Sequence, residues 1–253
     1  MLIAVLAITS SAQAIFEEDF ESYSVGEDVA KNGSGWASRA FDNYGKDNYA
    51  GAVVEVDSGT NGTQVGDLAN SSAWGTPYYH LDAADQFSAG HVHFDMLNYG
   101  GASRTWFSDS LSGPGFNFQG GVYVMNLSWV SGEDIFERHP AGNVFDEITG
   151  GNRAVGAFTH SQWHSYRIDF DFDGGTGGNG EWSLFIDDGS SAILSGALTT
   201  DGSSGGRSLK TIGWGIASGD GPLLDNIVVK PIPEPASGLL ILGGLACLLR
   251  RRA

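Results

Sequence analysis

The chain has 253 residues, among them 38 glycines, 13 Lys or Arg and 30 Asp or Glu, and its formal net charge is −17 at pH 7. This acidic balance disfavours nucleic acid and anionic membrane surfaces as partners and attracts divalent cations. A glycine share of about twice the usual ~7% favours turns over long helices. The single cysteine, Cys247, excludes an intramolecular disulfide.

The first 14 residues are predicted to be a signal peptide. Residues 2–8 are apolar, and Ala12-Gln13-Ala14 forms an A-x-A cleavage pattern. No Lys or Arg precedes the apolar stretch, so we expect the true start to lie further upstream. The mature protein is then expected to begin near Ile15.

The mature chain is predicted to consist of short strands joined by turns. The clearest signals are two period-2 alternations, at 163–172 and 181–187, which flank a Gly-rich turn and predict a hairpin. Segments 31–51, 57–66 and 131–151 are interpreted as loops or connections, the last with one helical turn near 135–139. Strands are expected at 52–56, 78–81, 91–97, 106–107, 116–118, 121–130, 163–172, 181–187, 193–198, 209–217 and 223–230.

Many short strands without helical periodicity predict an all-β domain over residues 15–230, an antiparallel jelly-roll β-sandwich. The hairpin sequence W-H-S-Y-R-I-D-F-D-F…W-S-L-F-I-D-D-G resembles the late hairpin of concanavalin A-like and laminin-G-like domains. The opening D-F-E-S-Y-x-x-G and the closing L-D-N-I-V-V resemble the first and last strands of that superfamily. The resemblance implies that these two strands lie close together.

A calcium site is predicted where the two ends meet. Asp19, Glu21 and Asp225 would supply carboxylate oxygens, which Ca²⁺ prefers, and related sandwiches carry a structural calcium at such a place. A second interpretation is that these acids protect the terminal strands from pairing with other molecules. Millimolar Ca²⁺ is expected to raise the melting temperature if the ion binds, and EDTA should reverse the rise.

Two further acidic motifs are weaker candidates. Asp169-x-Asp171-x-Asp173-Gly174 resembles the start of a calcium loop, but Gly180 stands where the twelfth-position Glu is required. A solvent-exposed strand face is the preferred interpretation. The stretch 133–137 (E-D-I-F-E) resembles the glycosidase motif E-x-D-x-E, but two of its acids are adjacent and would point to opposite sides of a strand. It is interpreted as a solvated charge cluster.

Histidines and aromatic residues supply the remaining candidates. His91 and His93 share one strand face and could bind a metal, although a polar outer face is preferred. Neither His160 nor His164 has a nucleophile motif as partner. The aromatic residues Trp106, Trp129 and Tyr78 could form a platform that stacks on sugar rings, although strand-borne aromatics more often fill the core.

The C-terminal segment, residues 231–253, is predicted to be a targeting segment. It contains the triplet Pro233-Glu234-Pro235, the uncharged apolar run 236–249 and the cluster Arg250-Arg251-Arg252. The run predicts a single hydrophobic helix of roughly 21 Å, short of a ~30 Å hydrocarbon core. In this order, the three features resemble the PEP-CTERM sorting signal of Gram-negative bacteria. That resemblance implies recognition of the triplet by an exosortase-type processing enzyme, with the helix as a transient inner-membrane span and the arginines as its cytoplasmic stop.

Together these features predict a non-enzymatic β-sandwich protein exported to the outer envelope or extracellular matrix, where it would bind polysaccharide. A secreted glycosidase or polysaccharide lyase on the same fold is the alternative. The prediction includes calcium as a structural cofactor and excludes nucleic acid as a partner.

Overall fold

The computed structural model describes residues 13–31, 36–40, 53–57, 63–68, 75–97, 102–109, 123–130, 134–141, 144–147, 153–154, 161–198, 202, 204–218 and 222–232. The predicted strand 116–118, the signal peptide up to residue 12 and the segment from Pro233 onward lie outside them. In these residues the regular structure is all strand apart from one 3-10 turn, Val29–Lys31. No helix of the described chain is long and apolar enough to cross a membrane.

The strands form two antiparallel sheets, which confirms the all-β prediction. The first sheet has the order β14 (Leu194–Gly196), β13 (Glu181–Ile186), β12 (Trp163–Asp171), β6 (Ala89–Leu97), β16 (Leu223–Pro231), β4 (Gln64–Asp67) and β3 (Val53–Val56), with β1 (Phe16–Glu18) also paired to β16. The second has the order β10 (Val144–Glu147), β9 (Asp134–Ala141), β8 (Tyr123–Val130), β7 (Ala102–Ser108), β15 (Thr211–Ser218), β5 (Gly75–His80) and β2 (Trp36–Ala40), with β11 (Arg153–Ala154) paired to β9.

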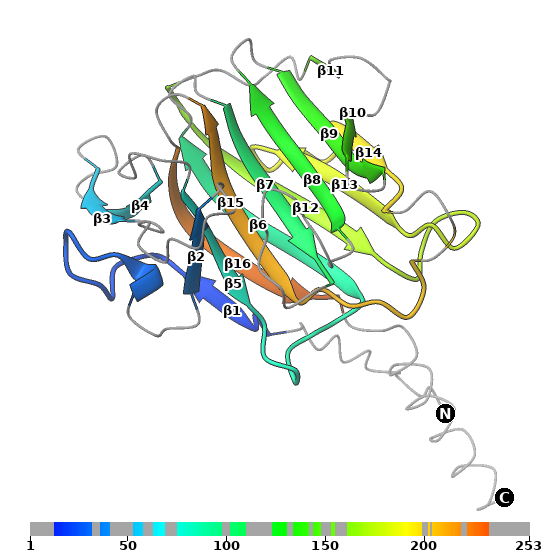
Figure 1. The fold of residues 1–253 in the computed structure, drawn as a ribbon, viewed down its shortest axis with the longest axis horizontal. Coiled ribbons are helices and arrows are strands. Elements are labelled where there is room, and N and C mark those ends of the chain that lie inside the picture. Colours follow the sequence, from blue (N-terminus) through cyan, green and yellow to red (C-terminus); the bar gives the residue numbers. More distant parts are fainter. Residues whose placement is uncertain are drawn as a thin grey trace, which may run out of the picture.

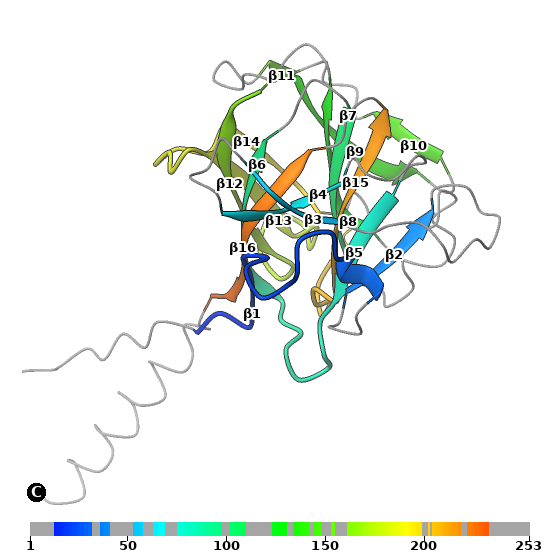
Figure 2. The same ribbon diagram turned by 90° about the vertical axis from the view of Figure 1, so that its left-hand side faces the viewer.

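The two sheets lie face to face and share one core, so the domain is a β-sandwich (Figures 1 and 2). Trp214 of β15 meets Phe94 of β6 edge to face, with ring centroids 5.5 Å apart. Phe16 of β1 stacks on Tyr79 of β5 with centroids 3.9 Å apart. Each contact joins one sheet to the other, and aromatic rings bury large areas, so these residues hold the two layers together.

The alternating sequences fold as their period predicts. In β6 and β12 every second residue is buried, and β12 pairs with β13 in the predicted hairpin. The first and last strands are neighbours, because β1 pairs with β16 through Phe16 and Val229. The last strand extends past the predicted boundary at 230, since it includes Pro231 and the N–H of Ile232 donates to the Ala89 carbonyl at 2.9 Å.

Three segments predicted as loops or turns contain strands. β2 lies within 31–51, β4 begins within 57–66 and ends at Asp67, and β9 and β10 lie within 131–151, where a helical turn near 135–139 was expected. These strands are short or polar, and apolar and polar residues alternate only weakly along them. Their extended conformation is therefore fixed by hydrogen bonds to a neighbouring strand. β9, for example, lies between β8 and β10 and pairs with both.

Candidate functional site

The three acids predicted to meet do line a common pocket. The β1–β16 pairing brings the turn after β1, which carries Asp19 and Glu21, beside Asp225 of β16. The open pocket has a volume of about 420 Å³, and its lining residues are Asp19, Glu21, Thr63, Asp95, Trp163, Asp225 and Asn226. We call it the acidic pocket. Its size is in the range of small-molecule sites.

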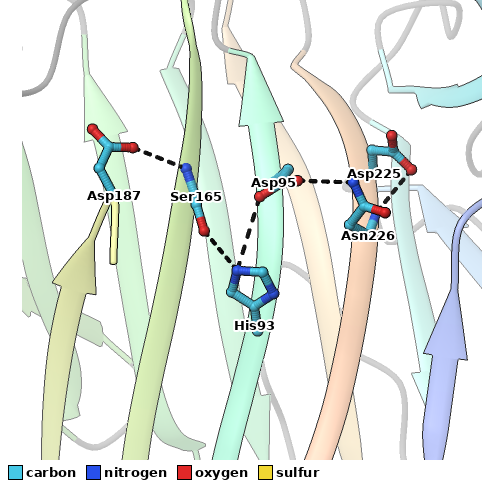
Figure 3. A network of polar contacts seen from close by, with 6 residues as sticks. All are labelled: His93, Asp95, Ser165, Asp187, Asp225 and Asn226. Atoms are coloured by element: carbon cyan, nitrogen blue, oxygen red, sulfur yellow. Dashed lines mark hydrogen bonds and ion pairs between the residues drawn. The ribbon is translucent and has the colours of Figure 1, made fainter. Parts of the chain in front are cut away.

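A β-bulge in β16 shapes one wall of the acidic pocket. The pairing of β16 with β6 shifts by one residue between Asp225 and Val228, and Asn226 has φ of 49°. Asn tolerates this left-handed conformation better than most residues. The Asn226 amide then donates to Asp95 Oδ2 at 2.8 Å, and its backbone N–H donates to Asp225 Oδ1 at 2.8 Å (Figure 3). The bulge therefore fixes both carboxylates beside the pocket.

The turn after β1 forms the opposite wall. Phe20 is fully buried with φ of 58°, and Gly66 leaves room for its ring, because a Cβ at Gly66 would lie 2.7 Å from Phe20 Cζ. On either side, Asp19 Oδ1 accepts the Glu21 N–H at 3.1 Å, and Glu21 Oε1 accepts the Gln64 N–H at 2.7 Å. The buried ring thus anchors a turn whose two acids face outward.

Asp225 has the most perturbed carboxyl group of the pocket. Burial raises its pKa to about 6 from the ordinary 3.8, the Asn226 N–H opposes this shift, and the negative charges of Asp95, Asp19 and Glu21 add to it. Only 9% of the residue is exposed. Ionised Asp225 is therefore desolvated and surrounded by like charges, which destabilises the folded chain at neutral pH.

We expect Asp225→Asn to stabilise the empty protein by about 1 to 2 kcal/mol at neutral pH. Because the folded-state pKa is raised, the favourable contribution of Asp225 is complete below about pH 4 and is lost as pH rises through about 6. The variant's advantage should therefore vanish at acidic pH. Chemical denaturation across this range measures it, with the exposed Asp82→Asn as control. An equal advantage at both ends of the range would contradict the prediction.

The calcium prediction meets a geometric difficulty. In the part of the chain that the structure describes, no group of three or more His, Cys, Asp or Glu side chains is placed to hold a metal ion. Glu21 is engaged by both the backbone and the side chain of Gln64, and one oxygen of Asp95 is taken by Asn226. The carboxylates surround a wide pocket, whereas Ca²⁺ needs six to eight oxygens at 2.3–2.6 Å. The side chains present do not fit the ion.

The motif Asp169-x-Asp171-x-Asp173-Gly174 closes the β12–β13 turn. Asp171 Oδ1 accepts the N–H groups of Asp173 and Gly174 at 2.8 and 2.9 Å, and Asp173 Oδ1 accepts the Gly206 N–H at 3.0 Å. Asp169 pairs with Arg167 at 3.0 Å on the strand surface. Asp171 thus satisfies backbone donors of its own turn, Asp173 ties that turn to Gly206, and Asp169 pairs with an arginine on the strand surface, which agrees with the preferred structural interpretation.

His91 and His93 lie on the outer face of β6, as their alternation predicts. His93 Nε2 lies 2.6 Å from Ser165 Oγ and 3.9 Å from Asp95 Oδ1, and the Ser165 N–H donates to Asp187 (Figure 3). The resulting chain of polar contacts runs from Asp187, the residue after β13, across β12 and β6 to β16. Burial lowers the pKa of His91. This network ties adjacent strands together on the surface of the first sheet.

The other acid and histidine candidates have structural positions. Positions 134 and 137 both lie in β9, three residues apart, so strand alternation places them on opposite sides of the sheet. His164 is buried, and its Nδ1 lies 2.8 Å from Asp187 Oδ2, which links the two strands of the hairpin. Glu133 and His160 fall outside the described residues.

The outer face of the second sheet carries the sugar-stacking candidates. Gly213 of β15 pairs with Tyr78 of β5 on one side and with position 106 of β7 on the other. Tyr78 also meets His80 edge to face at 4.9 Å. Position 129 pairs with Ser103 of β7. Ser103 is two residues from the buried Thr105 and so shares its side of the sheet, which assigns position 129 to the core side of the register. Positions 78 and 106 therefore share one row of the register with Gly213, and position 129 does not belong to it.

Sequence reasoning missed several residues of both regions. In the acidic pocket these are Thr63, Asp95, Trp163 and Asn226, and on the second sheet they are His80 and Gly213. Asp95 ends a recognised alternation and follows two outward-facing histidines, so its exposure could be predicted. No comparable pattern in the sequence predicts the β-bulge at Asn226.

Comparison with known proteins shows the fold alone. Neither a protein-family model nor a curated protein sequence matches the chain. Among solved structures, the PL-14 alginate lyase from Aplysia kurodai has a TM-score of 0.59 at 9% identity, covering 87% of this chain and 100% of the other. The alginate lyase vAL-1 from Chlorella virus has 0.54 at 11%, covering 87% and 100%. The T. cruzi calreticulin globular domain has 0.52 at 13%, covering 92% and 95%.

Proposed function

We propose that this chain is an exported jelly-roll, concanavalin A-like protein that binds polysaccharide through the outer face of its second sheet. The observation that carries the proposal is the row formed by Tyr78, Gly213 and position 106. Gly213 is buried and has no side chain, so the half-exposed ring of Tyr78 beside it would supply the surface on which a sugar ring stacks. Two of the similar structures are alginate lyases, so such a fold accommodates a polysaccharide in those proteins.

The net charge restricts the class of polysaccharide. At −17, the chain repels polyanions over the range of the Debye length, about 8 Å at physiological ionic strength. A polyuronate such as alginate would have to overcome this repulsion. We therefore propose a neutral or cationic glycan as the ligand.

Tyr78→Ala is expected to weaken glycan binding about fivefold, since an aromatic stacking contact contributes about 1 kcal/mol. The matched control is Phe185→Ala, which removes a partly exposed aromatic ring from the outer face of the first sheet. Binding to a glycan array followed by titration of the best ligand measures both variants. Equal losses in the two variants, or a loss only in Phe185→Ala, would contradict the assignment to the second sheet.

The proposed destination is the cell surface or extracellular matrix, reached by the C-terminal segment. Support comes from the order of Pro233-Glu234-Pro235, the uncharged run 236–249 and Arg250-Arg251-Arg252 in the sequence, all of which lie outside the described residues. An exosortase-type enzyme would recognise the triplet, and the arginines would hold the transient span at the cytoplasmic side.

Intact-mass measurement on protein from the native host is expected to give a chain that ends near Pro235. Loss of residues 236–253 would follow from processing at the triplet. Replacing Pro233 and Pro235 with alanine should block processing and leave the longer chain in the membrane fraction. A mature wild-type protein that retains Arg252 would refute the sorting proposal.

A polysaccharide lyase is the second candidate, and His80 favours it. Burial lowers the pKa of His80, which favours its neutral imidazole, and the Tyr78 ring is adjacent. A neutral imidazole accepts a proton and a phenol donates one, as an elimination reaction requires. If the chain is a lyase, unsaturated sugar absorbing in the ultraviolet will accumulate, and His80→Gln will abolish it. Intact glycan after prolonged incubation supports binding alone.

A further inference from the structure

The acidic pocket concentrates negative charge that none of its own lining residues neutralises. Four of its seven lining residues are Asp or Glu, and none of the described lining residues is Lys, Arg or His. Asp225 lines the pocket, and only 9% of the residue is exposed to solvent. An ionised carboxylate in such a position is costly unless a cation accompanies it.

One oxygen of Asp225 is left for a ligand. Its Oδ1 accepts the adjacent Asn226 N–H, and no described residue donates to Oδ2. Figure 3 shows the contact between this carboxylate and Asn226. The pocket is therefore lined by a nearly buried acceptor that has no partner in the described chain, beside two further carboxylates, Asp19 and Asp95.

The size of the pocket and the bonds already formed favour a larger cation than a metal ion. A volume of about 420 Å³ compares with about 30 Å³ for one water molecule. Glu21 contributes charge, but its oxygens are held by Gln64. The remaining carboxylates, Asp19, Asp95 and Asp225, come from the turn after β1, from β6 and from β16. Among the described residues, no group of three or more acidic, histidine or cysteine side chains is placed to hold a metal ion.

The aromatic wall indicates what kind of cation fits. Trp163 lines the pocket, and its Nε1–H already donates to Asp57 Oδ2 at 3.0 Å. The indole N–H is therefore engaged by Asp57, and what the residue adds to the pocket wall is aromatic surface, which attracts organic cations. Thr63 and Asn226 add polar groups suited to hydroxyls or amines.

We propose that the acidic pocket binds the ammonium group of an organic cation, held by Asp225, Asp19 and Asp95 and covered by the Trp163 ring. An ammonium group supplies three N–H donors, which suits carboxylates arranged around a pocket better than a bare ion does. The site is on the first sheet and the turn after β1, so it is separate from the row on the second sheet and does not depend on the proposed glycan binding.

The test uses glucosamine, which is a cation, and N-acetylglucosamine, which has the same ring without the charge. Calorimetric titration in phosphate buffer, free of Tris and other amines, should show saturable glucosamine binding and at least tenfold weaker binding of the neutral sugar. Asp225→Asn retains the Oδ1 acceptor for Asn226 and should weaken glucosamine binding at least tenfold. Asp82→Asn removes the same charge from an exposed position outside the pocket and should leave the affinity unchanged.

Several results would overturn this proposal. Equal affinity for the charged and neutral sugars, no binding of either, or equal losses in Asp225→Asn and Asp82→Asn would each do so. Calcium chloride titrated at matched ionic strength provides a further arm: saturable calcium binding that displaces glucosamine would restore the metal interpretation. Trp163→Phe, which keeps a ring, should weaken binding severalfold without loss of the folded-state circular dichroism spectrum.

Discussion

Glu18→Ala is expected to lower the free energy of unfolding by about 3 to 5 kcal/mol, equivalent to a fall in melting temperature of roughly 10 °C. The Glu18 carboxylate is buried and accepts three hydrogen bonds, from the Phe20 N–H at 2.9 Å, the Tyr23 hydroxyl at 3.0 Å and the Trp36 indole N–H at 3.1 Å. Truncation removes the shared acceptor and leaves buried donors without it.

Glu18 also holds a strained backbone. Phe20, with φ of 58°, occupies a conformation that costs a bulky residue roughly 1 to 2 kcal/mol. The Glu18 side chain fixes the Phe20 N–H, so its loss should loosen the turn that carries Asp19 and Glu21. We expect the Ala variant to lose binding at the acidic pocket as well as stability.

Two matched variants separate hydrogen bonding from charge. Glu18→Gln keeps one oxygen but places an amide N–H₂ among donors, so an intermediate loss is expected. Glu17→Gln changes an exposed neighbour on the same strand and should shift stability by less than about 0.5 kcal/mol. Thermal and urea unfolding measure all three. A Glu18→Ala protein as stable as the Glu17→Gln protein would refute the role of the carboxylate.

Gly90→Ala is expected to destabilise the domain by about 3 kcal/mol. A Cβ at Gly90 would overlap the Phe87 ring and the Lys230 carbonyl oxygen, and it would lie 2.9 Å from Phe87 Cδ2. The oxygen belongs to β16, which is paired to β6, so it cannot move without disturbing the centre of the first sheet. The ring stacks on Phe170 at 5.5 Å and closes one end of the core.

Gly205→Ala is the matched control for Gly90→Ala. Its nearest neighbour for an added Cβ is Asp173 Oδ1 at 3.7 Å, an ordinary contact, so a change within about 0.5 kcal/mol is expected. Adding Phe87→Leu to Gly90→Ala should recover part of the loss, because a smaller side chain relieves one of the two overlaps. If Gly90→Ala unfolds at the wild-type urea concentration, the close approach of β16 and Phe87 to Gly90 is not as the structure describes.

Local alternation was sufficient to predict the strands that carry the core. In β6, β12 and β13, apolar residues at every second position require one buried face, and the pleat of a strand provides it. The paired positions of β1 and β16 agree with the expectation drawn from the two ends of the sequence. By contrast, β2, β4 and β9 are defined by hydrogen bonds to neighbouring strands, which a local pattern does not contain.

The sequence by itself determined an acidic, strand-built chain, and the resemblance of its two ends to neighbouring strands predicted that Asp19, Glu21 and Asp225 could meet. Only the tertiary structure decided what surrounds them. Asp95 and Trp163 join the pocket because β6 lies between β16 and β12, and Asn226 turns toward it because one extra residue shifts the β16 register. Sheet order and bulges arise from contacts between residues far apart in the chain, and the shape and depth of a pocket depend on those contacts.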